Sequence, residues 1–139
     1  MTTGSVTTLT DIYQAQPVQE TLLVVDDNNI LRDSLADILR LEGYQVVAAQ
    51  NGRQALEIME VLAPDLVLSD ISMPEMDGVD FYRAVRQRPE WGTIPFIFLT
   101  AYSVKYEVAA AQELSAEDIL VKPVEFELLI NSIRSRLEH

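Results

Sequence analysis

Short apolar runs that end abruptly in polar residues constrain the fold of this chain more than any other feature. Residues 21–25 (Thr-Leu-Leu-Val-Val) run directly into Asp26 and Asp27. Residues 66–68 (Leu-Val-Leu) lead in the same way to Asp70, before a loop rich in turn residues. Continuous apolar runs are typical of strands buried on both faces, as in a parallel sheet. The pattern therefore predicts buried strands that carry acidic residues at their carboxyl ends.

The remaining segments alternate between strand and helix patterns. Further strands are predicted at residues 44–49, 94–99 and 118–121. Helical spacing of apolar residues predicts helices at 30–41 (followed by Gly43 as C-cap), 54–62, 79 to near 89, about 105–114, and 125–137. Five strands alternating with five helices predict an α/β fold, a doubly wound five-stranded parallel sheet in the order 2-1-3-4-5. Residues 1–20 are rich in Thr, Gln and Ser and are expected to be a flexible leader, which leaves 21–137 as one domain.

Composition excludes several classes of function. The formal net charge of -12 argues against direct binding of nucleic acid, because phosphate backbones would be repelled. The absence of cysteine excludes disulfides, thiolate metal sites and cysteine nucleophiles. No segment has the apolar length of a transmembrane helix and no signal peptide is evident, so a cytoplasmic protein without membrane contact is expected.

Polar residues follow four of the predicted strands and converge at one edge of the sheet. They are Asp26 and Asp27, Asp70, Thr100, and Lys122. In the predicted strand order these ends meet at the crevice where open α/β sheets bind ligands. Two carboxylates about 4 Å apart repel by about 4 kcal/mol at an effective dielectric constant near 20, so a cation is needed there. A hard divalent ion such as Mg²⁺ fits carboxylates and phosphate oxygens.

A carboxylate beside such a cation can act as a nucleophile toward phosphorus. Asp70 is the candidate, and its product would be an aspartyl phosphate. Lys122 would pair with the phosphoryl oxygens and the Thr100 hydroxyl would donate a hydrogen bond to them. Taken singly, each residue also has a simpler interpretation: Asp26 and Asp27 as helix caps, Asp70 as a turn residue, and Lys122 as a solvated charge.

The sequence resembles the receiver domains of two-component response regulators, of the chemotaxis-receiver type. The resemblance covers residues 21 to 137. It rests on residues 24–27 (Val-Val-Asp-Asp), Asp70 with 73–78 (Met-Pro-Glu-Met-Asp-Gly), 99–101 (Leu-Thr-Ala) and 121–123 (Val-Lys-Pro). It implies a flavodoxin-like receiver fold and a signalling module that catalyses only its own phosphorylation and dephosphorylation.

The resemblance also implies residue roles. Asp70 would accept a phosphoryl group from a phosphohistidine on a sensor histidine kinase or a histidine phosphotransfer protein. Asp27 and Asp70 would bind Mg²⁺ directly, with the backbone carbonyl of Ser72 as a further ligand, and Asp26 would act mainly through water. The implied output surface comprises the fourth helix, fifth strand and fifth helix, which would contact an output domain or a second copy.

Thr100 and Lys122 would sense the phosphoryl oxygens, but the chain departs from the family near Lys122. Receivers often carry an aromatic switch residue three positions before this lysine, where this chain has Ile119. Tyr102 and Tyr106 are nearby aromatic candidates, and the relay of the signal is left open.

Three alternatives remain beside this interpretation. A degenerate receiver could dock a partner without phosphorylation, which Ile119 leaves open. An aspartate-nucleophile phosphohydrolase would need a second carboxylate two residues after Asp70, where the chain has Ser72. A flavin-binding domain would need a phosphate loop after the first strand, where Asp26 and Asp27 would repel phosphate.

Overall fold

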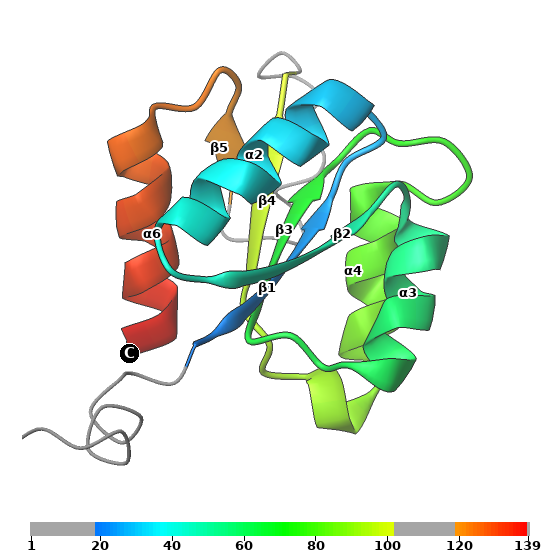
Figure 1. Cartoon of the computed structure of the whole chain (residues 1–139). Helices are drawn as coiled ribbons and strands as arrows, with labels where there is room; N and C mark the ends of the chain where they lie inside the picture. Colours follow the sequence, from blue (N-terminus) through cyan, green and yellow to red (C-terminus); the bar gives the residue numbers. More distant parts are fainter. Residues whose placement is uncertain (1–18, 102–118, 139) are drawn as a thin grey trace, which may run out of the picture.

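The protein forms a single parallel sheet with helices on both faces (Figure 1). The structure, a computed structural model, describes residues 19–101 and 119–138. The strand order is β2-β1-β3-β4-β5, as predicted, and every strand pair is parallel. The strands are β1 (Thr21–Val25), β2 (Gln45–Ala49), β3 (Leu66–Asp70), β4 (Phe96–Thr100) and β5 (Ile119–Val121).

Helices α2 and α6 cover one face of the sheet, and α3 and α4 cover the other (Figure 1). The described helices are α2 (Asn29–Leu41), α3 (Gly52–Val61), α4 (Gly78–Arg86), the short 3₁₀ helix η1 (Pro89–Trp91) and α6 (Phe126–Glu138). The described part of the chain thus contains four of the five predicted α-helices. The fifth, predicted at about 105–114, lies outside the described residues, as does the predicted leader up to residue 18. Within 19–101 and 119–138, no helix has both the length and the apolar character needed to cross a membrane.

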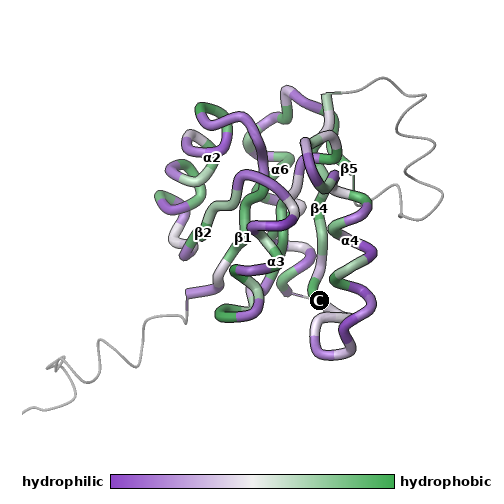
Figure 2. Tube along the Cα trace, turned by 90° about the vertical axis from the view of Figure 1, so that its right-hand side faces the viewer, coloured by the Kyte–Doolittle hydropathy of each residue, from purple (hydrophilic) through white to green (hydrophobic). Residues whose placement is uncertain are grey.

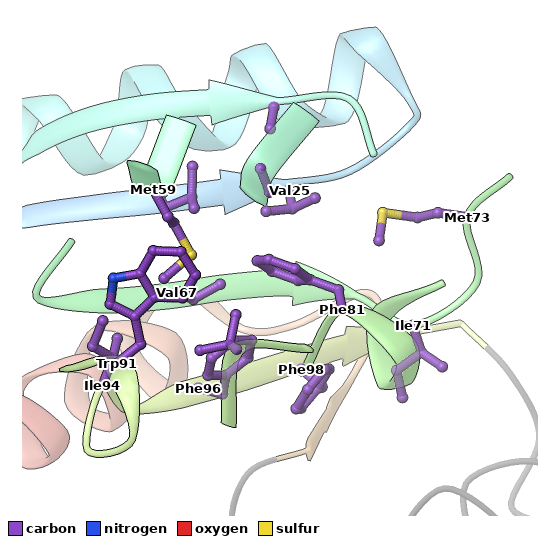
Figure 3. Packing of buried hydrophobic residues seen from close by; sticks show 14 residues of the cluster. Val25, Met59, Val67, Ile71, Met73, Phe81, Trp91, Ile94, Phe96 and Phe98 are labelled. Atoms are coloured by element: carbon purple, nitrogen blue, oxygen red, sulfur yellow. The ribbon is translucent and has the colours of Figure 1, made fainter. Parts of the chain in front are cut away.

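Alternate residues of each strand enter two separate cores. On β1, Leu22 and Val24 pack with α2 and α6, whereas Leu23 and Val25 pack with α3 and α4. The core between the sheet and helices α3 and α4 includes the fully buried Phe98 together with Trp91, and Figure 3 labels both residues. Burying one large apolar side chain contributes about 1.5–3 kcal/mol. Figure 2 shows β1 and β4 as mainly hydrophobic. Every residue of both strands is buried, which accounts for the continuous apolar runs in the sequence.

Short polar side chains fix where three helices begin. Asn28, Asn51 and Asp77 each accept a hydrogen bond from a backbone N–H in the first turn of α2, α3 and α4. The cap at Asn51 starts α3 at Gly52, two residues before its predicted start. Gly43 follows α2 with φ of 102°, a backbone conformation that favours glycine, which agrees with its predicted place at the helix end.

Candidate functional site

The strand register brings the polar strand ends to one level. Val25 is paired with Ser69, Asp70 with Leu99, and Thr100 with Val121. Asp26 and Asp27 therefore follow β1 next to Asp70 at the end of β3. Lys122 follows β5, and its backbone N–H donates to the Thr100 carbonyl at 2.7 Å. The structure therefore brings these five residues to the carboxyl edge of the sheet, as the sequence predicted.

The three carboxylates form a compact acidic cluster. One oxygen from each of Asp26, Asp27 and Asp70 lies within 4.8 Å of the others. Asp26 is buried, Asp70 is partly buried and Asp27 is exposed, so the cluster opens to solvent on one side. An all-oxygen donor set that remains open to water suits Mg²⁺, which keeps several of its own waters. The residues present therefore fit the predicted ion.

Lys122 supplies a positive charge inside the cluster. Its Nζ lies 2.9 Å from Asp26 Oδ2 and 3.5 Å from Asp70 Oδ2, and its side chain is only 19% exposed. Burial acts to lower the pKa of Lys122, but the hydrogen bond to Asp26 and the charges of Asp70 and Asp26 outweigh it, so the pKa is raised. Lys122 is therefore a firmly protonated ammonium group.

Asp70 is in the opposite electrostatic situation. Burial raises its pKa most, the attraction of Lys122 lowers it in part, and the like charge of Asp26 raises it further. The net result is a raised pKa. Desolvation and one neighbouring carboxylate thus outweigh the lysine, which leaves an energetically unfavourable anion at the end of β3.

The loop after Asp70 is folded tightly against the strand that carries it. The Gly78 N–H donates to the Ile71 carbonyl at 2.7 Å, and a Cβ at position 78 would lie 2.2 Å from the Asp70 carbonyl oxygen. Only glycine allows this approach. Ser72 lies in the same loop and is partly buried. A ligand role for its carbonyl remains a prediction, as does a sensing role for the fully buried Thr100.

Ile119 is placed beside the aromatic residues of β4. It pairs with Phe98 in the sheet and packs, partly buried, against the core that contains Phe98. The aliphatic side chain thus occupies the position of the family's aromatic switch. Tyr102 and Tyr106 lie outside the described residues.

Two features of the site were not predicted from the sequence. A hollow of about 460 Å³ adjoins Asp26 and Lys122 and is lined mainly by apolar side chains of α2 and of the segment after β5. In addition, Arg32 of α2 donates a hydrogen bond to the Asp26 carbonyl at 3.1 Å. Neither has a sequence signal, because an apolar stripe and an arginine on a helix are ordinary features of a helix packed on a sheet.

Known proteins resemble both the sequence and the fold. A protein of Leptolyngbya boryana, described as an uncharacterized 14.6 kDa protein in the sodA1 3′ region, is 42% identical over 107 residues, covering 77% of this chain and 82% of that protein. The DNA-binding response regulator MtrA of Mycobacterium tuberculosis is 35% identical over 120 residues, covering 86% of this chain. The matched region is only 51% of MtrA, so the chain spans about half the length of that relative.

Solved structures of receiver domains are also similar to this chain. The signal receiver domain of a signal transduction histidine kinase from Syntrophus aciditrophicus superposes with a TM-score of 0.79 at 35% identity, covering 85% of this chain and 89% of that one. The receiver domain of sensor histidine kinase PA1611 from Pseudomonas aeruginosa has a TM-score of 0.80 at 25% identity, covering 88% of this chain and 100% of that one. That structure contains a magnesium ion coordinated in the active site cleft.

The family model for the response regulator receiver domain matches residues 22–134, a range that contains the five strands except Thr21 and includes all four polar strand ends. The chain therefore belongs to the response regulator receiver domain family, the receiver modules of two-component signalling.

Proposed function

We propose that residues 21–137 form a phosphoacceptor receiver domain in a His-to-Asp phosphorelay, with Asp70 as the phosphoacceptor. The observation that carries this proposal is the set of groups around the Asp70 carboxylate. Two further carboxylates lie within 4.8 Å, and the Lys122 ammonium lies 3.5 Å away. An acceptor for a phosphoryl group needs both a nucleophile and positive charge nearby.

The acidic cluster would hold Mg²⁺. Asp27 and Asp70 would be direct ligands, the Ser72 carbonyl would be a third, and Asp26 would act through water. When bound, the ion neutralises phosphoryl oxygens that the carboxylates would otherwise repel. The other steps of the phosphoryl transfer would be carried out by Asp70, Lys122 and Thr100.

In the transfer step, an oxygen of the Asp70 carboxylate attacks the phosphorus of a phosphohistidine in line with the bond to nitrogen. The new O–P bond forms as the N–P bond breaks, and the histidine leaves with the bonding electron pair. The Lys122 ammonium would exchange part of its contact with Asp26 for the phosphoryl oxygens. The Thr100 hydroxyl would donate a hydrogen bond to one of them. The domain would catalyse only this step and the later hydrolysis.

The partner that donates the phosphoryl group would be a sensor histidine kinase or a histidine phosphotransfer protein, and the location would be the cytoplasm. The hollow beside Asp26 and Lys122 would give this partner an apolar contact surface, formed by Leu31 and Ile38 of α2 and Val124 after β5. The output surface would lie on the helix predicted at about 105–114, which is outside the described residues, on β5 and on α6, and would contact an output domain or a second copy. Because the whole chain has a formal net charge of -12, it would not bind nucleic acid directly.

The test is intact mass after incubation with Mg²⁺ and acetyl phosphate, with Asp70→Asn as the matched variant. We expect the wild type to gain one phosphoryl group that is stable in acid and labile in base, and the variant to gain none. If the wild type gains none, binding of the phosphate mimic beryllofluoride distinguishes rapid hydrolysis from an inactive site. Failure of both would overturn the proposal.

A second candidate is a docking module that works without phosphorylation. Ile119 favours it, because an aliphatic side chain packed against Phe98 has no ring to rotate when Thr100 moves. Failure of the wild type to react with acetyl phosphate and to bind beryllofluoride would make this the better description.

A further inference from the structure

Asp26 is held at every polar atom that it possesses. Its N–H donates to the Ala49 carbonyl of β2 at 3.1 Å. Its carboxylate accepts from the Asn28 N–H at 2.9 Å and from Lys122 Nζ at 2.9 Å. Its carbonyl oxygen accepts from Arg32 Nη1 at 3.1 Å. Of these four contacts, the one from Arg32 is the contact that acts on the peptide linking Asp26 to Asp27.

Arg32 is unusual among the arginines of α2 in how little of it meets solvent. Its side chain is 15% exposed, whereas the Arg40 side chain is 51% exposed. The Arg32 Nε lies 3.6 Å from Asp33 Oδ1, on the solvent side. Covering a guanidinium costs solvation free energy, which must be offset by contacts such as the one to Asp26. The hydrogen bond to the Asp26 carbonyl is therefore more than an incidental surface contact.

The Asp26 carbonyl determines where Asp27 points. A peptide unit is planar, so a donor that holds the carbonyl of residue 26 also fixes the plane from which residue 27 projects. Asp27 is exposed, and within residues 19–101 and 119–138 no hydrogen bond or ion pair holds its carboxylate. The direction of that carboxylate thus depends on its backbone.

We propose that Arg32 is a positioning residue of the acidic cluster, which holds the Asp26 carbonyl so that the Asp27 carboxylate projects toward Asp70 and a divalent cation can bind. This inference rests on the proposed function, because it concerns the Mg²⁺ site proposed for Asp26, Asp27 and Asp70. Arg32 touches neither the ion nor the reacting atoms. Its effect is on the affinity for the ion.

Charge and geometry act with opposite signs here, which makes the inference testable. Removing the positive charge of Arg32 near three carboxylates would by itself strengthen cation binding. Removing the hydrogen bond would weaken cation binding, because the loss of a group that orients a metal ligand typically lowers metal affinity by about 10–100-fold. A weaker site in a charge-removing variant is therefore evidence for positioning.

The experiment is isothermal titration calorimetry of the whole chain with MgCl₂, on wild type, Arg32→Met, Arg32→Lys and Arg40→Met. Arg40 is the matched control, because it lies on the same helix and also donates to a backbone carbonyl, that of Val46 at 3.0 Å, away from the cluster. We expect Arg32→Met to bind Mg²⁺ at least about tenfold more weakly and Arg32→Lys to fall between it and wild type. Arg40→Met should bind as wild type does or slightly more tightly.

Denaturant unfolding in EDTA, run on the same variants, separates positioning from stability. A purely structural role would lower the free energy of unfolding and leave the affinity of the folded protein unchanged, which would overturn the inference. So would an Arg32→Met affinity equal to or above that of wild type. If Arg32→Met does not fold, the charge-conserving Arg32→Lys decides, and wild-type affinity there overturns the inference. Absence of Mg²⁺ binding by the wild type would instead remove the proposed function and this inference together.

Discussion

The Asp70 carboxylate is held in an environment that does not favour its charge. Burial and the neighbouring Asp26 raise its pKa more than Lys122 lowers it. The folded protein consequently holds a proton on Asp70 to a higher pH than the unfolded chain does. The stability that this proton supplies is complete below the unfolded-state pKa and is lost as the pH rises through the folded-state pKa.

An Asp70→Asn variant is therefore expected to be more stable than wild type near pH 7 in EDTA, because its side chain is neutral at every pH. The difference should close as the pH falls below about 3.9, where the wild-type side chain is protonated in both states. Denaturant midpoints measured across this pH range check the expectation. Asp37→Asn, which removes an exposed carboxylate of α2, should stay within about 0.5 kcal/mol of wild type. A less stable Asp70→Asn near pH 7 would contradict the electrostatic account.

Gly78 is a second single residue on which the site depends. Gly78→Ala would place a Cβ 2.2 Å from the Asp70 carbonyl oxygen, so the loop must move, at an expected cost of about 3 kcal/mol. Gly92→Ala is the control, because its nearest atom is 3.4 Å away and its φ of -64° suits alanine. That variant should change the free energy of unfolding by less than about 1 kcal/mol in urea unfolding. Similar losses in both variants would show that the close approach at Asp70 is unimportant.

At the scale of elements, α4 packs against β4 through contacts between aromatic rings. Tyr82 of α4 lies edge-on to Phe96 and Phe98, with centroid distances of 5.1 and 5.8 Å, and Phe96 stacks on Phe98 at 5.5 Å. The guanidinium of Arg86 covers Tyr82 at 4.8 Å from the ring centre. Because Phe98 is two residues before Thr100 on the same side of β4, this ring layer links α4 to the candidate site.

Phe98→Ala should accordingly lower the free energy of unfolding by about 3–5 kcal/mol, since it removes a fully buried ring from this layer. Phe126→Ala provides the comparison, because that ring on α6 is 42% exposed and its loss should cost about 1 kcal/mol or less. Chemical denaturation of both variants measures the difference. Equal costs would mean that the ring layer contributes no more than a surface aromatic does.

The elements were largely predictable from the sequence, since continuous apolar runs and helical spacing reflect burial on two faces. The errors lie at their ends. Helix α3 starts earlier than predicted because Asn51 caps it, although Asn51 and Gly52 together are also typical of a turn. The 3₁₀ helix at Pro89–Trp91 carries no periodic pattern and was not predicted.

The convergence of the candidate site residues was predictable from the sequence, whereas their detailed geometry was not. Asp26, Asp27, Asp70, Thr100 and Lys122 could be placed together, because parallel strands end at one edge. That Lys122 lies closer to Asp26 than to Asp70 depends on side-chain conformations set by packing. The contact from Arg32 to the Asp26 carbonyl has the same origin, so no spacing in the sequence indicates it.

At the scale of the whole molecule, the three carboxylates at one edge of the sheet would couple folding to cation binding under the proposed function. Mg²⁺ at ten times its dissociation constant is expected to stabilise the folded domain by about 1.4 kcal/mol, provided that the unfolded chain does not bind it. Thermal unfolding with and without Mg²⁺ measures this shift. Asp27→Ala should abolish it, and an equal shift in that variant would place the ion elsewhere.

The ion pair between Lys122 and Asp26 joins residues that are 96 positions apart. During synthesis at about 5–20 residues per second, the ribosome adds Lys122 roughly 5–20 seconds after Asp26. Asp70 is added during that interval, so from then until Lys122 is added the nascent chain has all three carboxylates but lacks their lysine. Under the proposed function, an unfinished copy has no complete acceptor site. Partly synthesised chains would therefore not accept a phosphoryl group. Only a copy whose translation has passed β5 would do so.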